Sequence, residues 1–351
     1  MIIFLCVLLL ICCAYLYLLF FYNRTRSFLR VNLLKQEVTH SIDVVVTWVD
    51  THDTKWSKLK QQFLKNYSDN HPSRWADKLS KPDTELEYCL LSICKHLPYV
   101  RRIFVVTMRP QSPPCVSINK QLHNEFQKER IRVVHHDEVF TDPWKNKITF
   151  NSKCIESFLH NIPGLAEHFL YFNDDFYVNR YIAPQYLFQM NKPVFYGKLK
   201  SNRFRKRVLC NDYDKQECAM HKTINLVQDT WPSLFFRGWH QFQPLTKTIV
   251  EQTTQRFNPH IRTVRNNTFR QKNGVSVIQL CLNYALNTQQ ALLGRNRDLH
   301  EKCVDTLIID IQHPETLLSS QIPHHVHTFC VNNCNSKKCQ MALDAYFKER
   351  L

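Results

Sequence analysis

The chain is poor in glycine, with 5 glycines against 15 prolines among its 351 residues. Loops that cradle phosphates with backbone amides need closely spaced glycines, because a side chain would keep the backbone away from the phosphates. Neither G-x-G-x-x-G nor G-x-x-x-x-G-K-[ST] occurs. These absences argue against the classical dinucleotide-binding and P-loop classes of protein.

The C-x-x-C motif and recognisable nucleic-acid-binding modules are also missing. No C-x-x-C pair occurs among the 14 cysteines, which argues against a structural zinc site. The net charge of +16 comes from 46 basic and 30 acidic residues. The basic side chains are spread along the chain, apart from one cluster at 198–207, and no recognisable nucleic-acid-binding module accompanies them. We therefore expect no nucleic-acid partner.

The longest apolar run lies at the start of the chain. Residues 1–22 carry no charge and are long enough to cross a hydrocarbon core about 30 Å thick. We interpret them as a single transmembrane anchor, followed by a basic linker at 23–40 and one catalytic domain at 41–351. The basic residues after the run favour a cytosolic domain. The sequons that begin at Asn23, Asn66 and Asn266 favour the lumen of the ER or Golgi, which we expect.

Residues 169–178, FLYFNDDFYV, contain the most informative strand pattern. The first four have no polar alternation, which predicts a strand covered on both faces in an α/β sheet. Asn173, Asp174 and Asp175 would then lie at its carboxyl end, where open α/β sheets bind ligands. Two adjacent carboxylates suit Mg²⁺ or Mn²⁺, with Ca²⁺ as a further candidate, and such a metal would hold nucleotide phosphates. A plain turn or helix cap is the alternative.

Similar patterns recur along the chain. Residues 42–49 form another buried strand pattern and end at Asp50, which is either a ligand-binding acid or the N-cap of the next helix. A helical pattern at 85–97 and a strand pattern at 103–107 follow, which predicts a parallel sheet. Residues 149–162 predict an amphipathic helix that is capped by Asn151 or Ser152.

Several blocks in this order resemble one family, the Stealth proteins. This family includes bacterial capsular-polysaccharide phosphotransferases and the catalytic part of the GlcNAc-1-phosphotransferase that acts on lysosomal enzymes. The resemblance runs from about residue 42 almost to the end, through the blocks 42–50, 85–107, 133–140 and 149–178, the region around His240 and the tail 329–333. The long block with Asn151, Pro163-Gly164 and Asn173-Asp174-Asp175 is highly specific.

The resemblance implies a nucleotide-sugar-transferase-like fold: a GT-A-like, Rossmann-type mixed sheet flanked by helices. It also implies transfer of a hexose-1-phosphate, for example GlcNAc-1-phosphate, from a UDP-sugar to a sugar hydroxyl of a glycan or polysaccharide. Such chemistry needs a metal at the diphosphate, positive donors on the phosphoryl group and a base at the acceptor. A glycosyltransferase and an inactive carbohydrate-binding protein are the alternatives.

The resemblance also assigns roles to residues of this chain. The metal would be held by Asp174, Asp175 and Asn333. His240 would be the base or the nucleophile, unless it is a buried histidine held by a backbone carbonyl, and Arg270 would clamp phosphate. The substrate-binding residues would be Asp50, Asn151, Ser152, Asn173 and Arg102.

The chain departs from the family pattern at two places. Asn332-Asn333 stands where the family usually has Asn-Asp, so an amide replaces one carboxylate. An acidic residue that usually follows the family's arginine is missing from the segment after Arg270.

Overall fold

The computed structural model describes residues 37–65, 84–200, 215–231, 235–294, 307–308, 322, 326–332 and 337–351. The predicted anchor 1–22, most of the linker, and Asn333 lie outside these residues, so the membrane and lumenal assignments stay predictions. Within the described ranges, no helix has the length and apolar character needed to cross a membrane.

A five-stranded mixed sheet forms the centre of the protein. Its order is β10-β4-β1-β2-β3, with the last four parallel to one another and β10 antiparallel to β4. The bounds are β1 Ile42–Thr47, β2 Ile103–Thr107, β3 Ile131–His135, β4 His168–Asn173 and β10 Gln243–Thr246. The predicted α/β sheet is therefore confirmed.

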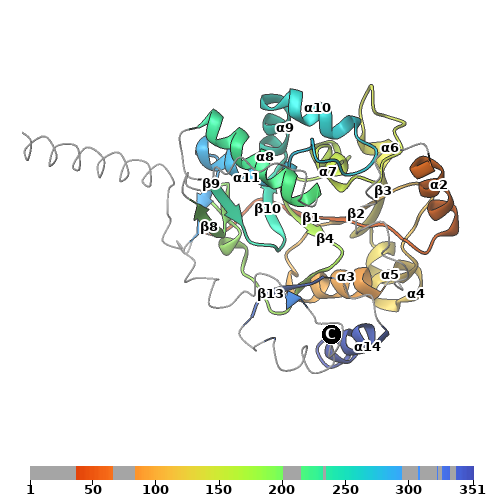
Figure 1. Cartoon of the computed structure of the whole chain (residues 1–351). Helices are drawn as coiled ribbons and strands as arrows, with labels where there is room; N and C mark the ends of the chain where they lie inside the picture. The colour runs from red at the N-terminus through yellow and green to blue at the C-terminus, as the bar shows by residue number, and fades with distance from the viewer. Residues whose placement is uncertain are drawn as a thin grey trace, which may run out of the picture.

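Helices cover both faces of this sheet (Figure 1). Alternate residues point to opposite faces, so Val44 and Val46 join one apolar core and Val45 joins the other. The first core is completed by α3 (Thr84–His96), α4 (Pro114–Ile118), α5 (Lys120–Gln127) and α14 (Lys337–Lys348). The second is completed by α7 (Ser152–Glu156), α8 (Lys215–Thr230), α9 (Lys247–Arg256), α10 (Asn258–Asn266) and α11 (Val277–Asn287).

The strand order creates a topological switch point between β1 and β4. The chain adds β2 and β3 on one side of β1 and then returns to add β4 on the other side. Thr47 at the end of β1 pairs with Asn173 at the end of β4, so the two carboxyl ends are level. In open α/β sheets the ligand crevice lies at this position, which makes this edge the place to look for a site.

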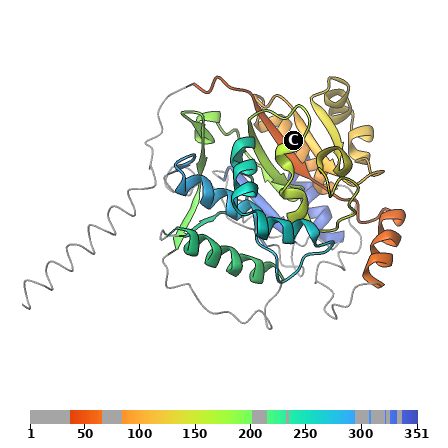
Figure 2. The same cartoon turned by 90° about the horizontal axis from the view of Figure 1, so that it is seen from above.

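Smaller elements lie outside the central sheet. A helix, α2 (Thr54–Lys65), lies at the periphery in both views (Figures 1 and 2). A short helix, α6 (His136–Val139), follows β3. The other strands of the described residues form three small sheets. The first contains β5 (Phe176–Val178), β12 (Leu307–Ile308) and β13 (Thr328–Asn332), and the second contains β6 (Phe188–Gln189), β7 (Lys192–Phe195) and β11 (Leu292–Leu293). The third pairs β8 (Gly197–Lys200) with β9 (Phe235–Gly238).

The strand predicted to end at Asn173-Asp174-Asp175 is confirmed as β4, and the Asp174-Asp175 turn leads from it into β5. Two other local predictions need correction. The predicted helix at 149–162 ends as an α-helix at Glu156, and a 3-10 turn, Leu159–Asn161, follows. The physical reason lies in α10: Arg265 Nη2 donates to the Ser157 carbonyl at 2.7 Å, so this carbonyl is satisfied from outside the helix.

The second correction concerns the start of α2. Asp50 does not cap this helix, because Asp53 Oδ1 accepts from the backbone N–H groups of Lys55 (2.8 Å) and Trp56 (3.3 Å). The cap at α7 is confirmed, since Asn151 Oδ1 accepts from Lys153 N at 3.2 Å. Asp50 is therefore not needed for capping, and its carboxylate remains a candidate for ligand binding.

A buried carboxylate fixes the opposite, amino edge of the sheet. Asp43 is fully buried and accepts four hydrogen bonds: two from the Arg101 guanidinium, at 3.0 and 2.6 Å, and two from the backbone N–H groups of Arg102 and Ala166, at 3.1 and 2.7 Å. These bonds tie the start of β1 to the starts of β2 and β4.

We expect Asp43→Ala to lower the free energy of unfolding by about 3 kcal/mol, because two buried backbone donors lose their acceptor. Urea unfolding followed by tryptophan fluorescence measures the change. Glu349→Ala, at a side chain that is 76% exposed, is the control and should change stability by less than about 0.5 kcal/mol. Equal stabilities of the two variants would contradict this account of Asp43.

Candidate active site

Two neighbouring aspartates form the turn at the carboxyl end of β4. The Asp175 side chain is 8% exposed, and its Oδ1 has no hydrogen-bond partner among the described residues. Its carbonyl accepts from Val331 N at 3.2 Å, which ties the turn to β13. A buried carboxylate oxygen without a partner is costly unless it binds a cation. This turn therefore fits a cation ligand better than it fits a plain structural turn.

The residues at this turn fit a hard divalent cation. Mg²⁺ binds through one or two carboxylates and completes its shell with water and substrate phosphates. Asp174 and Asp175 supply two such groups, and in the described part of the chain no three His, Cys, Asp or Glu side chains gather for a metal. β13 passes Asp175 and ends at Asn332, whereas the predicted metal ligand Asn333 lies outside the described residues.

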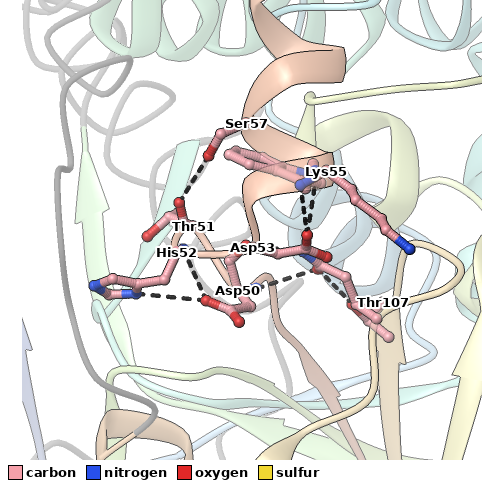
Figure 3. Close-up of polar contacts among 9 residues, drawn as sticks. Asp50, Thr51, His52, Asp53, Lys55, Ser57 and Thr107 are labelled. Atoms are coloured by element: carbon pink, nitrogen blue, oxygen red, sulfur yellow. Dashed lines mark hydrogen bonds and ion pairs between the residues drawn. The ribbon is translucent and has the colours of Figure 1, made fainter.

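Asp50 is held at the carboxyl end of β1 by a buried glutamine. The Gln111 amide nitrogen donates to the Asp50 carbonyl at 2.8 Å, and its oxygen accepts from Asp50 N (3.2 Å) and from the Thr107 hydroxyl (3.3 Å). Asp50 Oδ1 accepts from His52 N at 2.8 Å, with the His52 ring beside it (Figure 3). The backbone at Asp50 is thus fixed, while 29% of its side chain stays exposed at the carboxyl edge of the sheet.

Stacked aromatic rings bring the loop of Arg270 to the same region. Phe150 contacts Trp56 edge-on at 5.4 Å and stacks on Phe269 at 5.1 Å. This packing places the loops before Asn151 and Arg270 side by side. Arg270 Nη2 then donates to Ser152 Oγ at 2.7 Å. Asn151 itself is buried, and its amide nitrogen donates to the carbonyls of Val264 in α10 and of Asn267, which follows α10. Asn151 therefore ties α7 to α10 in addition to capping α7.

Three site residues were not predicted from the sequence: Glu156, Tyr171 and Thr47. The Tyr171 hydroxyl lies 3.2 Å from Thr47 Oγ1, 3.1 Å from Asn173 Oδ1 and 3.5 Å from Glu156 Oε1. Burial raises the pKa of the Glu156 carboxyl, against the opposing effect of Arg270 and Lys153. The sequence did contain a signal for Glu156, because it lies four residues after Ser152 and therefore on the same face of α7.

His240 lies next to the aspartate turn. It precedes β10, which runs antiparallel to β4 with Gln243 opposite Tyr171, so this segment passes the carboxyl end of β4. Its ring meets Phe176 edge-on, with centroids 5.2 Å apart. The residue is exposed, so the interpretation of His240 as a buried structural histidine is wrong.

The structure brings most of the predicted residues together but leaves Arg102 apart. Arg102 precedes β2, and its backbone N–H binds Asp43 at the amino edge of the sheet. Asp50, Asn173, Asp174 and Asp175 follow the carboxyl ends of β1 and β4. Because these strands are parallel, the start of β2 and the ends of β1 and β4 lie at opposite edges.

Comparison with known proteins gives one family. The model of Stealth protein CR2, conserved region 2, matches residues 80–195. A capsular polysaccharide phosphotransferase of Actinobacillus suis is 27% identical over 326 residues, which cover 90% of this chain and 82% of that protein. The corresponding values for capsular polysaccharide phosphotransferase LcbA of Aeromonas hydrophila are 28% over 307 residues, 84% and 79%.

Solved structures show only a distant likeness. The galactosyltransferase LgtC, in complex with donor and acceptor sugar analogs, aligns with a TM-score of 0.40 at 10% identity and covers 87% of this chain and 95% of its own. A TM-score at this level does not establish a shared fold. The sequence relatives match nearly the whole chain, and the matched conserved region contains α3, β2 and the aspartate turn. The chain belongs to the Stealth protein family.

Proposed function

We propose that this protein transfers a hexose-1-phosphate from a UDP-sugar to a hydroxyl of a glycan or polysaccharide and so forms a phosphodiester. The names of the relatives support a phosphotransferase. The observation that carries the proposal is the convergence, at the β1–β4 switch point, of two carboxylates, an exposed imidazole and an arginine. These are the groups that phosphoryl transfer from a diphosphate requires.

Each group has a role in this reaction. Asp174 and Asp175 would hold a divalent cation, Mg²⁺ or Mn²⁺, which would neutralise charge on the donor diphosphate. Arg270, fixed by Ser152, donates to the transferred phosphoryl group. Asp50 lies across the switch point, where the nucleotide half of the donor would bind. His240 removes the proton of the acceptor hydroxyl.

The product distinguishes this reaction from glycosyl transfer. Hexose-1-phosphate transfer breaks the bond between the two phosphates and releases UMP, whereas glycosyl transfer breaks the sugar–phosphate bond and releases UDP. We expect UMP, and a phosphodiester signal in the ³¹P NMR spectrum of the product, when the full chain is incubated with a UDP-sugar, Mn²⁺ and a glycan acceptor.

Release of UDP with a new glycosidic bond would instead establish a glycosyltransferase. If the protein bound the donor without any turnover across a panel of UDP-sugars and glycans, the proposal would be overturned in favour of an inactive carbohydrate-binding relative.

A further inference from the structure

We propose that Lys198, Arg237 and Trp239 bind an anionic group, a carboxylate or a phosphate, on the acceptor glycan; this inference rests on the proposed function and names the class of its acceptor. Lys198 and Arg237 are exposed and stand directly opposite each other in the antiparallel pair β8–β9. Lys198 begins the basic cluster at 198–207, to which the proposed reaction gives no role. We call Lys198, Arg237 and Trp239 the basic platform.

The two cations of the platform stand together without a counter-charge from the described residues. Directly opposite residues of an antiparallel pair share a face, with Cβ atoms about 4.5–5.5 Å apart, and like charges at such positions destabilise the pair. In the described part of the chain, neither Lys198 nor Arg237 forms an ion pair with a carboxylate. An anion bound between them would remove this repulsion and would receive charged donors from both side chains.

Packing fixes the two strands in this register. Leu199 and Phe236, on one side of the basic pair, also stand opposite each other and pack against the second core. Gly197 and Gly238 form the opposite pair on its other side, and they are two of the 5 glycines in the chain. A Cβ atom on Gly197 would overlap the Arg237 carbonyl oxygen. The close approach of the strands therefore needs glycine, and it keeps the two basic side chains level.

Trp239 orients one of the cations and leads to the proposed base. Lys198 Nζ lies 4.5 Å from the centroid of the Trp239 ring. Such a cation–π contact holds the ammonium group, which has three N–H donors, and leaves donors for a ligand. The Trp239 N–H donates to the Tyr196 carbonyl at 3.1 Å, and its carbonyl accepts from the Gln243 amide at 2.8 Å. His240 is the next residue, so the platform ends beside the base.

The position of the platform favours the acceptor over the donor. In phosphoryl transfer the attacking and leaving oxygens lie roughly in line, on opposite sides of the phosphorus. The nucleotide leaves, and its proposed partner Asp50 follows β1. Residues 239–242 connect β9 to β10, which ends the sheet opposite β3, and Figure 1 shows β8 and β9 on the far side of β10 from β1. The platform therefore lies on the side from which the hydroxyl attacks.

Binding of matched glycans to the full chain tests the inference without turnover. The probes are an oligogalacturonate with its neutral methyl ester, and a mannose oligosaccharide with and without one phosphate monoester. In calorimetry without donor, we expect one charged probe to bind about 10-fold more tightly than its neutral partner at about 0.05 M salt, and less so at about 0.5 M, because salt screens exposed charges. The pair that shows the difference identifies the anion as carboxylate or phosphate.

Substitutions then assign the difference to the platform. Lys198→Gln and Arg237→Gln should each weaken binding of the charged probe, and raise its acceptor KM, by about 10-fold, with the neutral probe and the donor KM within about 2-fold of wild type. Lys120→Gln on α5 and Arg262→Gln on α10 remove the same charges from exposed side chains and are the matched controls. Equal binding of charged and neutral probes to the wild type, or wild-type discrimination in both platform variants, would overturn the inference.

An anionic membrane is the competing partner for two exposed cations. Transfer by the full chain is therefore also measured in vesicles with and without phosphatidylserine. If transfer depends on this lipid, and both platform variants lose that dependence while their discrimination between the glycan probes is unchanged, the platform contacts a membrane and the inference is overturned.

Binding and transfer together keep this inference apart from the proposed function. Discrimination between charged and neutral probes without transfer from any UDP-sugar would overturn the proposed function and leave the platform as a glycan-binding site. Transfer with equal KM for charged and neutral acceptors would overturn this inference alone.

Discussion

Asp174→Asn and Asp175→Asn are each expected to reduce transfer by about a thousandfold or more, because in the proposed reaction each of these carboxylates would hold the metal at the diphosphate. Losing such a ligand costs several kcal/mol of transition-state stabilisation, and each 1.36 kcal/mol is a factor of ten in rate. Transfer of labelled sugar phosphate at saturating Mn²⁺ measures the loss. Asp137→Asn, an exposed carboxylate after β3, is the control and should keep wild-type turnover.

Stability measurements should show that the two variants lose transfer without losing the fold. Asp175 is buried with one oxygen unpartnered among the described residues. Without metal, replacing this charge by an amide should therefore not lower stability. In the wild type, added Mn²⁺ should raise Tm by mass action, and this rise should be smaller in both variants. Wild-type turnover in either variant, or an undiminished Mn²⁺ response, would contradict the assignment of these aspartates to the metal.

His240→Ala is expected to lower transfer by about two or more orders of magnitude, because a sugar hydroxyl attacks poorly until a base accepts its proton. A ring nitrogen of imidazole can accept that proton. Because the side chain is exposed, its loss leaves no cavity and the fold should survive. Donor binding, measured by calorimetry, should stay within about 3-fold of wild type, since the base touches the acceptor rather than the donor.

The control for this variant is His260→Ala, which removes another exposed imidazole, on α10. Turnover in His240→Ala equal to that of the control would reject a catalytic role. The nucleophile alternative has its own signature. If His240 attacks the β-phosphorus, an N–P bond forms, the bond to the α-phosphate breaks, and one equivalent of UMP is released without acceptor. A base leaves UMP release dependent on the acceptor.

The sequence alone determined the strands of the site and the acids that follow them. Buried strands in a parallel sheet are near-continuous apolar runs, so carboxylates are found near the strand ends, as with Asp43 near the start of β1 and the acids that follow β1 and β4. This is why Asp50, Asp174 and Asp175 could be placed at one edge before the structure was known. The cap of α7 at Asn151 was also predictable, because capping depends on contacts within a few residues.

Only the tertiary structure decided which distant residues join these acids. Arg270 meets Ser152 across 118 positions of the chain, and Thr47 meets Tyr171 across 124. No local pattern encodes such contacts. The position of Arg102 was also decided by the tertiary structure. Arg102 belongs to a block that resembles the family, but it precedes β2 and therefore lies at the amino edge of the sheet, opposite the site. Local propensity acts over a few residues, whereas the geometry of a site depends on how strands and helices pack, and that is set by the whole core.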